Sequence, residues 1–262
     1  MQNCKKIALI FIGLIFTAVI SFTDKLPDTF QIIPKPRKVE ILKGPGLKFG
    51  GLKGIAIKGD ITKPVLGPIL AILPGKEAGS KKILTLVLSN EKSLPESGEG
   101  YVLNIKNGRA EIKSRKEAGL FYGCQTLEQL LEDARDTGSV VPACRIVDYP
   151  DLDYRAIHID VKHHLDTMRY YYESIDRLAR YKINAIIFEF EDKLRYRRRP
   201  EVGAPQAMSI DEVAAMTRYA RCRNIEISPL IQGLGHATFI LKHEKYAHLR
   251  EDPESRWALL SH

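Results

Sequence analysis

The sequence predicts an α/β protein in which a small α+β domain precedes the first units of a parallel β/α sheet. Three observations carry this prediction: a hairpin signal in the first half, a regular alternation of strand-like and helix-like segments in the second half, and a length of 262 residues, which exceeds the usual size of one domain. Hydrophobic residues make up 44% and charged residues 27% of the chain, as in ordinary globular proteins. We therefore expect an α+β domain over residues 28–142 and a β/α domain over residues 146–262.

The first 23 residues have the pattern of a secretory signal peptide. Lys5-Lys6 precede the uninterrupted apolar run Ile7–Ile20, and the small polar residue Ser21 follows. The run is shorter than the ~20 residues that span a bilayer. We expect cleavage near Phe22–Asp24 and a secreted or periplasmic protein without a stable membrane span. An uncleaved signal that anchors the chain to a membrane is the alternative.

The expected N-terminal domain begins with short strands. Two β-like runs, Gly54–Lys58 and Lys82–Leu88, come first. The segment Tyr101–Lys113 then alternates apolar and polar residues on both sides of Asn107-Gly108, the dipeptide that accepts positive φ at both centres of a tight hairpin turn.

A helix is expected directly after this hairpin. Ser114 and Glu117 have the spacing of a capping box, apolar residues recur at helical spacing to about Ala134, and Gly138 follows the last turn. Strands followed by a helix, without strand–helix alternation, are typical of a small α+β domain.

The second half alternates strands and helices. The strand-like runs are Ala156–Val161, Asn184–Phe190 and Ile225–Ile231. Asp166 can cap the first intervening helix, and Ser209 with Glu212 forms a capping box for the second. The order β-α-β-α-β predicts a parallel sheet with right-handed crossovers. An open doubly wound sheet and a (β/α)8 barrel both fit this order.

Polar side chains gather where these strands end, and ligands of both architectures bind at the carboxyl ends of the strands. Glu189 and Glu191 share one face of their strand. Asp192 follows that strand, and His236 follows the next one, so the two form a candidate Asp–His couple for acid/base chemistry. A turn cap is the alternative for Asp192. The whole set comprises Asp160, Lys162, His163, His164, Glu189, Glu191, Asp192, Gln232 and His236.

Other patterns exclude several functions. Gly233–Thr238 begins like a dinucleotide-binding motif, but it has Thr238 in place of the third small residue and follows the third strand instead of the first. Cys124, Cys144 and Cys222 are widely spaced and give no metal signature. We expect buried free thiols, with a Cys124–Cys144 bridge as the alternative.

Basic charge is concentrated in one place. The formal net charge of +8 falls by two with the signal segment, and much of the remainder lies in Lys193–Arg199. This excess is milder than that of a nucleic-acid-binding protein. The run is interpreted as a solvated loop, or alternatively as a contact surface for an anionic partner or polysaccharide.

Several motifs, in the right order, resemble one family. Tyr101–Leu131 resembles the N-terminal α+β domain of glycoside hydrolase family 20, the β-N-acetylhexosaminidases, and Ile146–His164 resembles that family's approach to its first barrel strand. Ile186–Asp192 and Pro229–Glu251 resemble the hexosaminidase D-like branch. The resemblance covers most of residues 30–257 and implies that the second domain holds the first three βα units of a (β/α)8 TIM barrel.

The resemblance also implies an activity and residue roles. Family 20 enzymes remove terminal β-linked GlcNAc or GalNAc from glycans with retention, and the substrate's own acetamido oxygen attacks the anomeric carbon, outside the usual two-carboxylate scheme. Asp192 and His236 are then catalytic residues that form a relay with a glutamic acid, and Arg155 binds the terminal sugar. Glu189, at the same strand end, is also expected to bind substrate. The chemistry needs no cofactor and no metal.

One part of the family's machinery is not found. The family's adjacent Asp-Glu pair follows the fourth barrel strand, whereas the only such pair here is Asp211-Glu212, inside a helix start. A complete barrel takes ~250 residues, so three strands cannot close one. We expect the N-terminal part of a longer hydrolase, inactive by itself. The alternatives are a non-catalytic carbohydrate-binding or scaffold protein of the same family, and an unrelated open α/β domain that binds a phosphorylated ligand.

Overall fold

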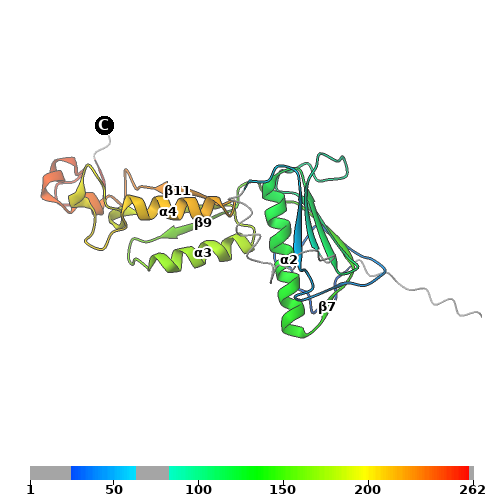
Figure 1. The fold of residues 1–262 in the computed structure, drawn as a ribbon. Helices are drawn as coiled ribbons and strands as arrows, with labels where there is room; N and C mark the ends of the chain where they lie inside the picture. The colour runs from blue at the N-terminus through cyan, green and yellow to red at the C-terminus, as the bar shows by residue number, and fades with distance from the viewer. Residues whose placement is uncertain (1–24, 63–82, 260–262) are drawn as a thin grey trace, which may run out of the picture.

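The computed structural model describes residues 25–62 and 83–259, so the expected signal segment lies outside the described residues. Figure 1 shows two sheets of different size, a larger one packed against helix α2 and a smaller one packed against helices α3 and α4. Both strand-rich regions share one continuous hydrophobic core cluster. In the described ranges no helix is both long enough and apolar enough to cross a membrane.

The N-terminal domain contains a six-stranded mixed sheet in the order β1-β8-β5-β6-β4-β3. The predicted hairpin is confirmed: β5 and β6 pair antiparallel, and Asn107 and Gly108 both have positive φ, 54° and 70°. A separate two-stranded ribbon pairs β2 (Leu47–Lys48) with β7 (Val140–Val141). The bounds of the six strands are β1 Lys38–Ile41, β3 Gly54–Lys58, β4 Ile83–Leu88, β5 Tyr101–Lys106, β6 Arg109–Ser114 and β8 Cys144–Asp148.

Helix α2 (Glu117–Thr137) covers one face of this sheet and ends at Gly138, whose φ of 65° is left-handed, as expected. The predicted capping box at its start is wrong. Ser114 is the last residue of β6, and its buried hydroxyl donates to the Gly100 carbonyl at 2.7 Å. The Glu117 carboxylate accepts instead from the amide and hydroxyl of Thr62. Ser114 Oγ also accepts from the amide of Lys116, the N-cap residue, at 3.3 Å, but the two side chains do not form the reciprocal capping box.

The first domain extends further along the chain than residue 142. Strand β8 pairs antiparallel with β1 on one side and with β5 on the other, so it lies inside the six-stranded sheet. The boundary between the domains consequently falls after Asp148. The thiols of Cys124 and Cys144 are free and buried, as expected, and Cys222 is free and half-buried.

The second domain contains a parallel three-stranded sheet in the order β11-β10-β9, which confirms the predicted alternation. Its strands are β9 (Ala156–Asp160), β10 (Ala185–Glu189) and β11 (Glu226–Leu230). Helix α3 (Met168–Arg180) follows β9 and helix α4 (Ile210–Arg221) follows β10. Shorter helical turns are η1 (Glu191–Lys193), η2 (Pro200–Val202), α5 (Thr238–Leu241) and η3 (Glu244–Leu249).

The cap predicted for helix α4 is confirmed, and the cap predicted for helix α3 is wrong. Helix α4 has the predicted capping box, in which Ser209 and Glu212 satisfy each other's backbone amides. Helix α3 is capped by Thr167, whose hydroxyl accepts from the amide of Tyr170, so the prediction of Asp166 as the cap is wrong by one residue.

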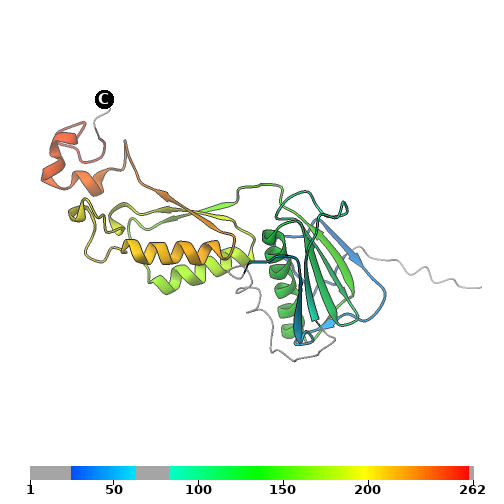
Figure 2. The same cartoon turned by 45° about the horizontal axis from the view of Figure 1, so that its top comes forward.

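The two faces of the small sheet differ. Figure 2 shows α3 and α4 on the same side of the three strands, and Phe188 of β10 packs against Tyr171 of α3 at 5.4 Å between ring centroids. Because side chains alternate along a strand, Ile187 and Glu189 point to the other face. The parallel register brings His158 and Ser228 to that same face, opposite Ile187. None of the described helices covers it.

Candidate active site

Charged side chains from all three strand ends converge at the carboxyl edge of the small sheet. Lys162 follows β9, Asp192 lies in η1 directly after β10, and His236 follows β11. The parallel strands bring these segments together, because their carboxyl ends lie on one edge. We call Lys162, Glu191, Asp192, Lys193, His236 and Lys242 the strand-end cluster.

Asp192 is held by two lysines. Its Oδ1 accepts from the Lys193 ammonium at 2.5 Å and its Oδ2 from the Lys242 ammonium at 2.8 Å. Burial raises the pKa of Asp192, but the hydrogen bonds from Lys193 and Lys242 together outweigh it, so the pKa is lowered below its ordinary value. The side chain is thus a paired carboxylate and caps no turn.

His236 has an unusual backbone and a different partner from the one expected. Its φ is +53°, a left-handed conformation that is uncommon outside glycine, whereas neither Gly233 nor Gly235 has a positive φ. The left-handed backbone position in this bend is therefore the histidine itself and not one of its flanking glycines. The imidazole lies against the Trp257 ring, with 4.3 Å between centroids, and its Nδ1 is 3.4 Å from the Lys162 ammonium.

The direct Asp192–His236 couple is not formed. Both residues lie in the described part of the chain, and no hydrogen bond joins them; the two oxygens of Asp192 accept from Lys193 and Lys242. Their catalytic roles stay predictions. The structure brings both to the strand-end cluster and links them only indirectly: Lys193, bound to Asp192, also donates to the Lys162 carbonyl at 2.9 Å.

Glu191 is the most deeply buried member of the strand-end cluster, with 3% of its surface exposed. Its Oε1 lies 3.0 Å from the Lys162 ammonium, and its φ of +42° is another left-handed value. Two strained residues, Glu191 and His236, thus flank one lysine. Such outliers cluster at functional sites, because the surrounding structure must hold them in place. Sequence reasoning placed Lys162 at the strand end and gave it no role.

Glu189 lies on the uncovered face of the sheet, just below this cluster. Its exposed fraction is 4%, its Oε2 is 2.9 Å from His158 Nε2, and its Oε1 accepts from the Gln232 amide at 2.9 Å. These contacts join the three strands across that face. The predicted contact of Glu189 with substrate stays a prediction. His158 was missed, although the two-residue period of β9 puts it on the same face as Asp160.

Arg155 does not join the other candidate residues. It stands before β9, at the amino edge of the sheet, roughly 16 Å along the strand from Asp160. Its guanidinium donates to Glu99 at 2.5 Å and to the Lys182 carbonyl at 2.7 Å. The first contact reaches the N-terminal domain, so this side chain helps to join the domains. Its sugar-binding role stays a prediction that the position does not support.

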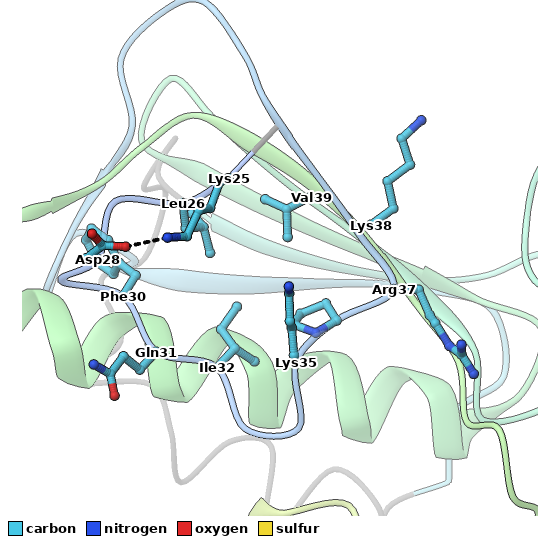
Figure 3. A pocket seen from close by; sticks show the side chains of 11 residues that line it. Lys25, Leu26, Asp28, Phe30, Gln31, Ile32, Lys35, Arg37, Lys38 and Val39 are labelled. Atoms are coloured by element: carbon cyan, nitrogen blue, oxygen red, sulfur yellow. Dashed lines mark hydrogen bonds and ion pairs between the residues drawn. The ribbon is translucent and has the colours of Figure 1, made fainter. Parts of the chain in front are cut away.

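A cavity in the N-terminal domain lacks the pair of ionisable groups that acid–base catalysis needs. It has a volume of about 790 Å³ and is lined by residues 25–39 of the N-terminal domain. Figure 3 shows Leu26, Ile32 and Val39 beside the open space, whereas Lys38 points away from it. Among the described lining residues Asp28 supplies the only carboxylate, and it pairs with Lys25 at 2.7 Å. One neutralised surface carboxylate provides no acid–base pair, so the strand-end cluster is the better candidate.

No metal centre is found among the described residues, where no three His, Cys, Asp or Glu side chains lie close enough together to hold an ion.

The basic run at Lys193–Arg199 divides into two parts. Lys193 is buried within the strand-end cluster, whereas Arg197 to Arg199 are exposed.

Comparison with known proteins agrees with this architecture. Residues 29–149 match the family model described as glycosyl hydrolase family 20, domain 2. The β-N-acetylhexosaminidase of Cellulomonas fimi is 28% identical over 183 residues, which cover 66% of this chain and 36% of that protein. Hexosaminidase D of Bos taurus is 34% identical over 98 residues, 37% of this chain and 28% of that protein.

Solved structures extend the match into the second domain. The family 20 β-N-acetylhexosaminidase of Streptomyces coelicolor A3(2) superposes with a TM-score of 0.71 at 25% identity, over 87% of this chain and 51% of that one. A Streptomyces plicatus β-hexosaminidase mutant in complex with the product GlcNAc gives a TM-score of 0.70 at 25% identity, over 88% of this chain and 51% of that one. By its family-model match over residues 29–149, its curated relatives and its structural neighbours, the chain is similar to glycoside hydrolase family 20 proteins. It covers about a third of the length of curated relatives such as the Cellulomonas fimi enzyme.

Proposed function

We propose that the gene product containing this chain is a β-N-acetylhexosaminidase, a glycoside hydrolase that removes terminal β-linked GlcNAc or GalNAc from glycans. The observation that carries the proposal is the strand-end cluster, in which Asp192 and His236 lie at the carboxyl edge of three parallel strands in a chain similar to family 20 proteins. Relatives named β-N-acetylhexosaminidase and a related structure with bound GlcNAc support it.

The proposal includes a fold assignment for the second domain. Strands β9, β10 and β11 are the first three strands of a (β/α)8 barrel, and the face that carries His158 and Glu189 is turned toward the barrel interior. Parallel pairing in chain order, and helices on one side only, support this assignment. The polar character of the uncovered face also supports it, because a sheet face that packed against the outer helices of a barrel would be apolar.

The reaction we propose is retaining and substrate-assisted. The acetamido oxygen of the substrate forms a bond to the anomeric carbon as the glycosidic bond breaks, and a general acid gives a proton to the departing oxygen. Water then opens the cyclic intermediate. Asp192 and His236 take the relay positions next to that acid. The only Asp-Glu pair of this chain cannot supply it, because Glu212 is engaged in the cap of α4 with Ser209.

Two enzyme preparations test this proposal. The complete gene product is expected to hydrolyse an aryl N-acetylglucosaminide, and residues 25–262 alone are expected not to. An inactive but folded gene product would contradict the hexosaminidase assignment. Robust hydrolysis by residues 25–262 would contradict the proposed dependence on an acid outside this chain, and Glu189 and Glu191 would then become the first candidates for that acid.

We also propose secretion or periplasmic export, with a membrane anchor as the alternative. The basic start and the apolar run Ile7–Ile20 support export. N-terminal sequencing of the mature protein from its native host is expected to begin near Phe22–Asp24. An N-terminus at Met1 in a membrane fraction would favour the anchor.

A further inference from the structure

We propose that Lys162 is a positioning residue that fixes His236 in the neutral tautomer protonated at Nε2. The proposal rests on the hexosaminidase function proposed above. Its starting point is the contact between the Lys162 ammonium and His236 Nδ1, at 3.4 Å.

The chemistry of the two groups determines which atom donates. A lysine ammonium carries three N–H donors and has no acceptor. In a hydrogen bond to His236 Nδ1, the ring nitrogen must therefore be the acceptor, with its lone pair free. A neutral imidazole carries only one ring proton, so that proton resides on Nε2. The Nε2–H group then points away from Lys162, as a donor.

This tautomer is the opposite of the one that an Asp–His couple produces. A carboxylate at Nδ1 would hold the proton there and leave Nε2 as a base. In this protein the oxygens of Asp192 are engaged with Lys193 and Lys242, and the partner of Nδ1 is a cation. His236 is consequently arranged to donate a hydrogen bond to an oxygen acceptor, such as a carboxylate, and not to remove a proton through Nε2.

Lys162 is itself fixed by contacts with the end of its own strand β9 and with the segment that follows β10. Its ammonium lies 3.0 Å from the buried Oε1 of Glu191, which supplies the opposite charge. Its amide donates to Asp160 at 2.8 Å, and its carbonyl accepts from the Lys193 ammonium at 2.9 Å. The lysine therefore has a defined position independent of His236.

The imidazole, which is exposed, has one further contact, with Trp257. Trp257 lies against the ring, and the left-handed φ of His236 limits the directions that its side chain can take. One lysine, one aromatic ring and one strained backbone position thus define the orientation of the Nε2–H donor. Of these three, only Lys162 distinguishes one ring nitrogen from the other.

Nitrogen NMR of the 262-residue chain determines the tautomer of His236 and does not require the chain to be enzymatically active. With 15N-labelled histidine at pH ~8, where histidine side chains are ordinarily neutral, long-range 1H–15N spectra separate the two tautomers, and His236→Gln assigns the signal. The wild type is expected to show protonated Nε2. Lys162→Met is expected to shift His236 to a mixture of tautomers, and Lys162→Arg to restore the wild-type pattern. A proton on Nδ1 in the wild type, or an unchanged pattern in Lys162→Met, would overturn the proposal.

Kinetics of the complete gene product supply a second readout. Lys162→Met is expected to lower kcat about tenfold or more, the scale of a misplaced proton-transfer group, with KM changed by less than about twofold. Lys162→Arg is expected to recover most of the rate, and the exposed Lys58→Met in the N-terminal domain serves as the control that changes neither. If the wild type is inactive, the proposed function fails and the NMR result still decides the role of Lys162. An active Lys162→Met enzyme with unchanged kcat would overturn the positioning role.

Discussion

The faces of the two sheets that lie opposite the described helices carry polar residues for different reasons. In the N-terminal sheet, Asn104 pairs with Glu111 on one side and with Arg145 on the other, and all three are half-buried and reach solvent. In the small sheet, Glu189 on the uncovered face and Glu191 just beyond it are 4% and 3% exposed. Burying charge costs free energy unless partners compensate for it. The polar residues of the first face thus keep contact with solvent, whereas the second face has the character of a functional site.

Core packing gives the largest expected difference between the two regions. Leu103 of β5 is fully buried beneath α2, and Ile187 of β10 is half-buried on the uncovered face of the small sheet. Leu103→Ala is expected to cost about 3 kcal/mol of unfolding free energy, and Ile187→Ala about 1 kcal/mol or less. Urea denaturation of both variants measures the difference. Equal costs would show that the uncovered face is packed in solution.

The contact between the domains offers the next largest effect. The ammonium of Lys182 donates to Asp148 at 2.7 Å and to the Tyr101 hydroxyl at 2.9 Å, and all three groups are buried. Burial lowers the pKa of Lys182, and the Asp148 carboxylate only partly opposes that shift. Asp148→Ala is expected to cost about 3 kcal/mol, because it leaves a buried ammonium without its counter-charge.

The double variant Asp148→Leu with Lys182→Met is the control for this prediction. It is expected to recover much of the loss, because both buried charges are replaced by apolar groups. Thermal unfolding compares the two variants with the wild type. A double variant as unstable as Asp148→Ala would indicate that the polar network, and not charge pairing, stabilises this junction.

Acid sensitivity at the far end of the second domain is the smallest expected effect. Hydrogen bonds from Lys245 and Tyr246 lower the pKa of Glu201 to about 2. Because the folded-state pKa is depressed, the stabilisation is present above the ordinary value of 4.5 and is lost as pH falls toward 2. The unfolding midpoint, followed through Trp257 fluorescence, is expected to decrease over this pH range. Glu201→Gln is expected to reduce that decrease, and an identical pH dependence in the variant would contradict the assignment.

Local signals in the sequence predicted much of the fold. Asn107-Gly108 and the second capping box involve neighbouring residues, so their structures follow from short-range chemistry. Strand β8 was missed because its partners β1 and β5 are distant in the sequence. Ser114 fits a capping box locally, yet its hydroxyl bonds Gly100 across the sheet. Non-local pairing overrode the local pattern in both cases.

The candidate site was predictable in its location and not in its connections. The carboxyl ends of parallel strands identify Asp192 and His236 as neighbours. The lysine contacts of these two residues depend on side chains from three separate strand ends. They also depend on two left-handed backbone positions, Glu191 and His236. No spacing in the sequence encodes those contacts. The sequence therefore suggested an Asp–His couple where the structure has lysines between the two residues.

Asp192→Asn in the complete gene product decides whether the catalytic site lies at the strand-end cluster. The amide removes the negative charge that Lys193 and Lys242 surround. We predict a kcat at least about tenfold lower, a KM within about twofold, and a circular dichroism spectrum like that of the wild type. An unchanged kcat in a folded Asp192→Asn enzyme would contradict this location of the catalytic site and would leave Asp192 as a structural ion-pair partner of the two lysines.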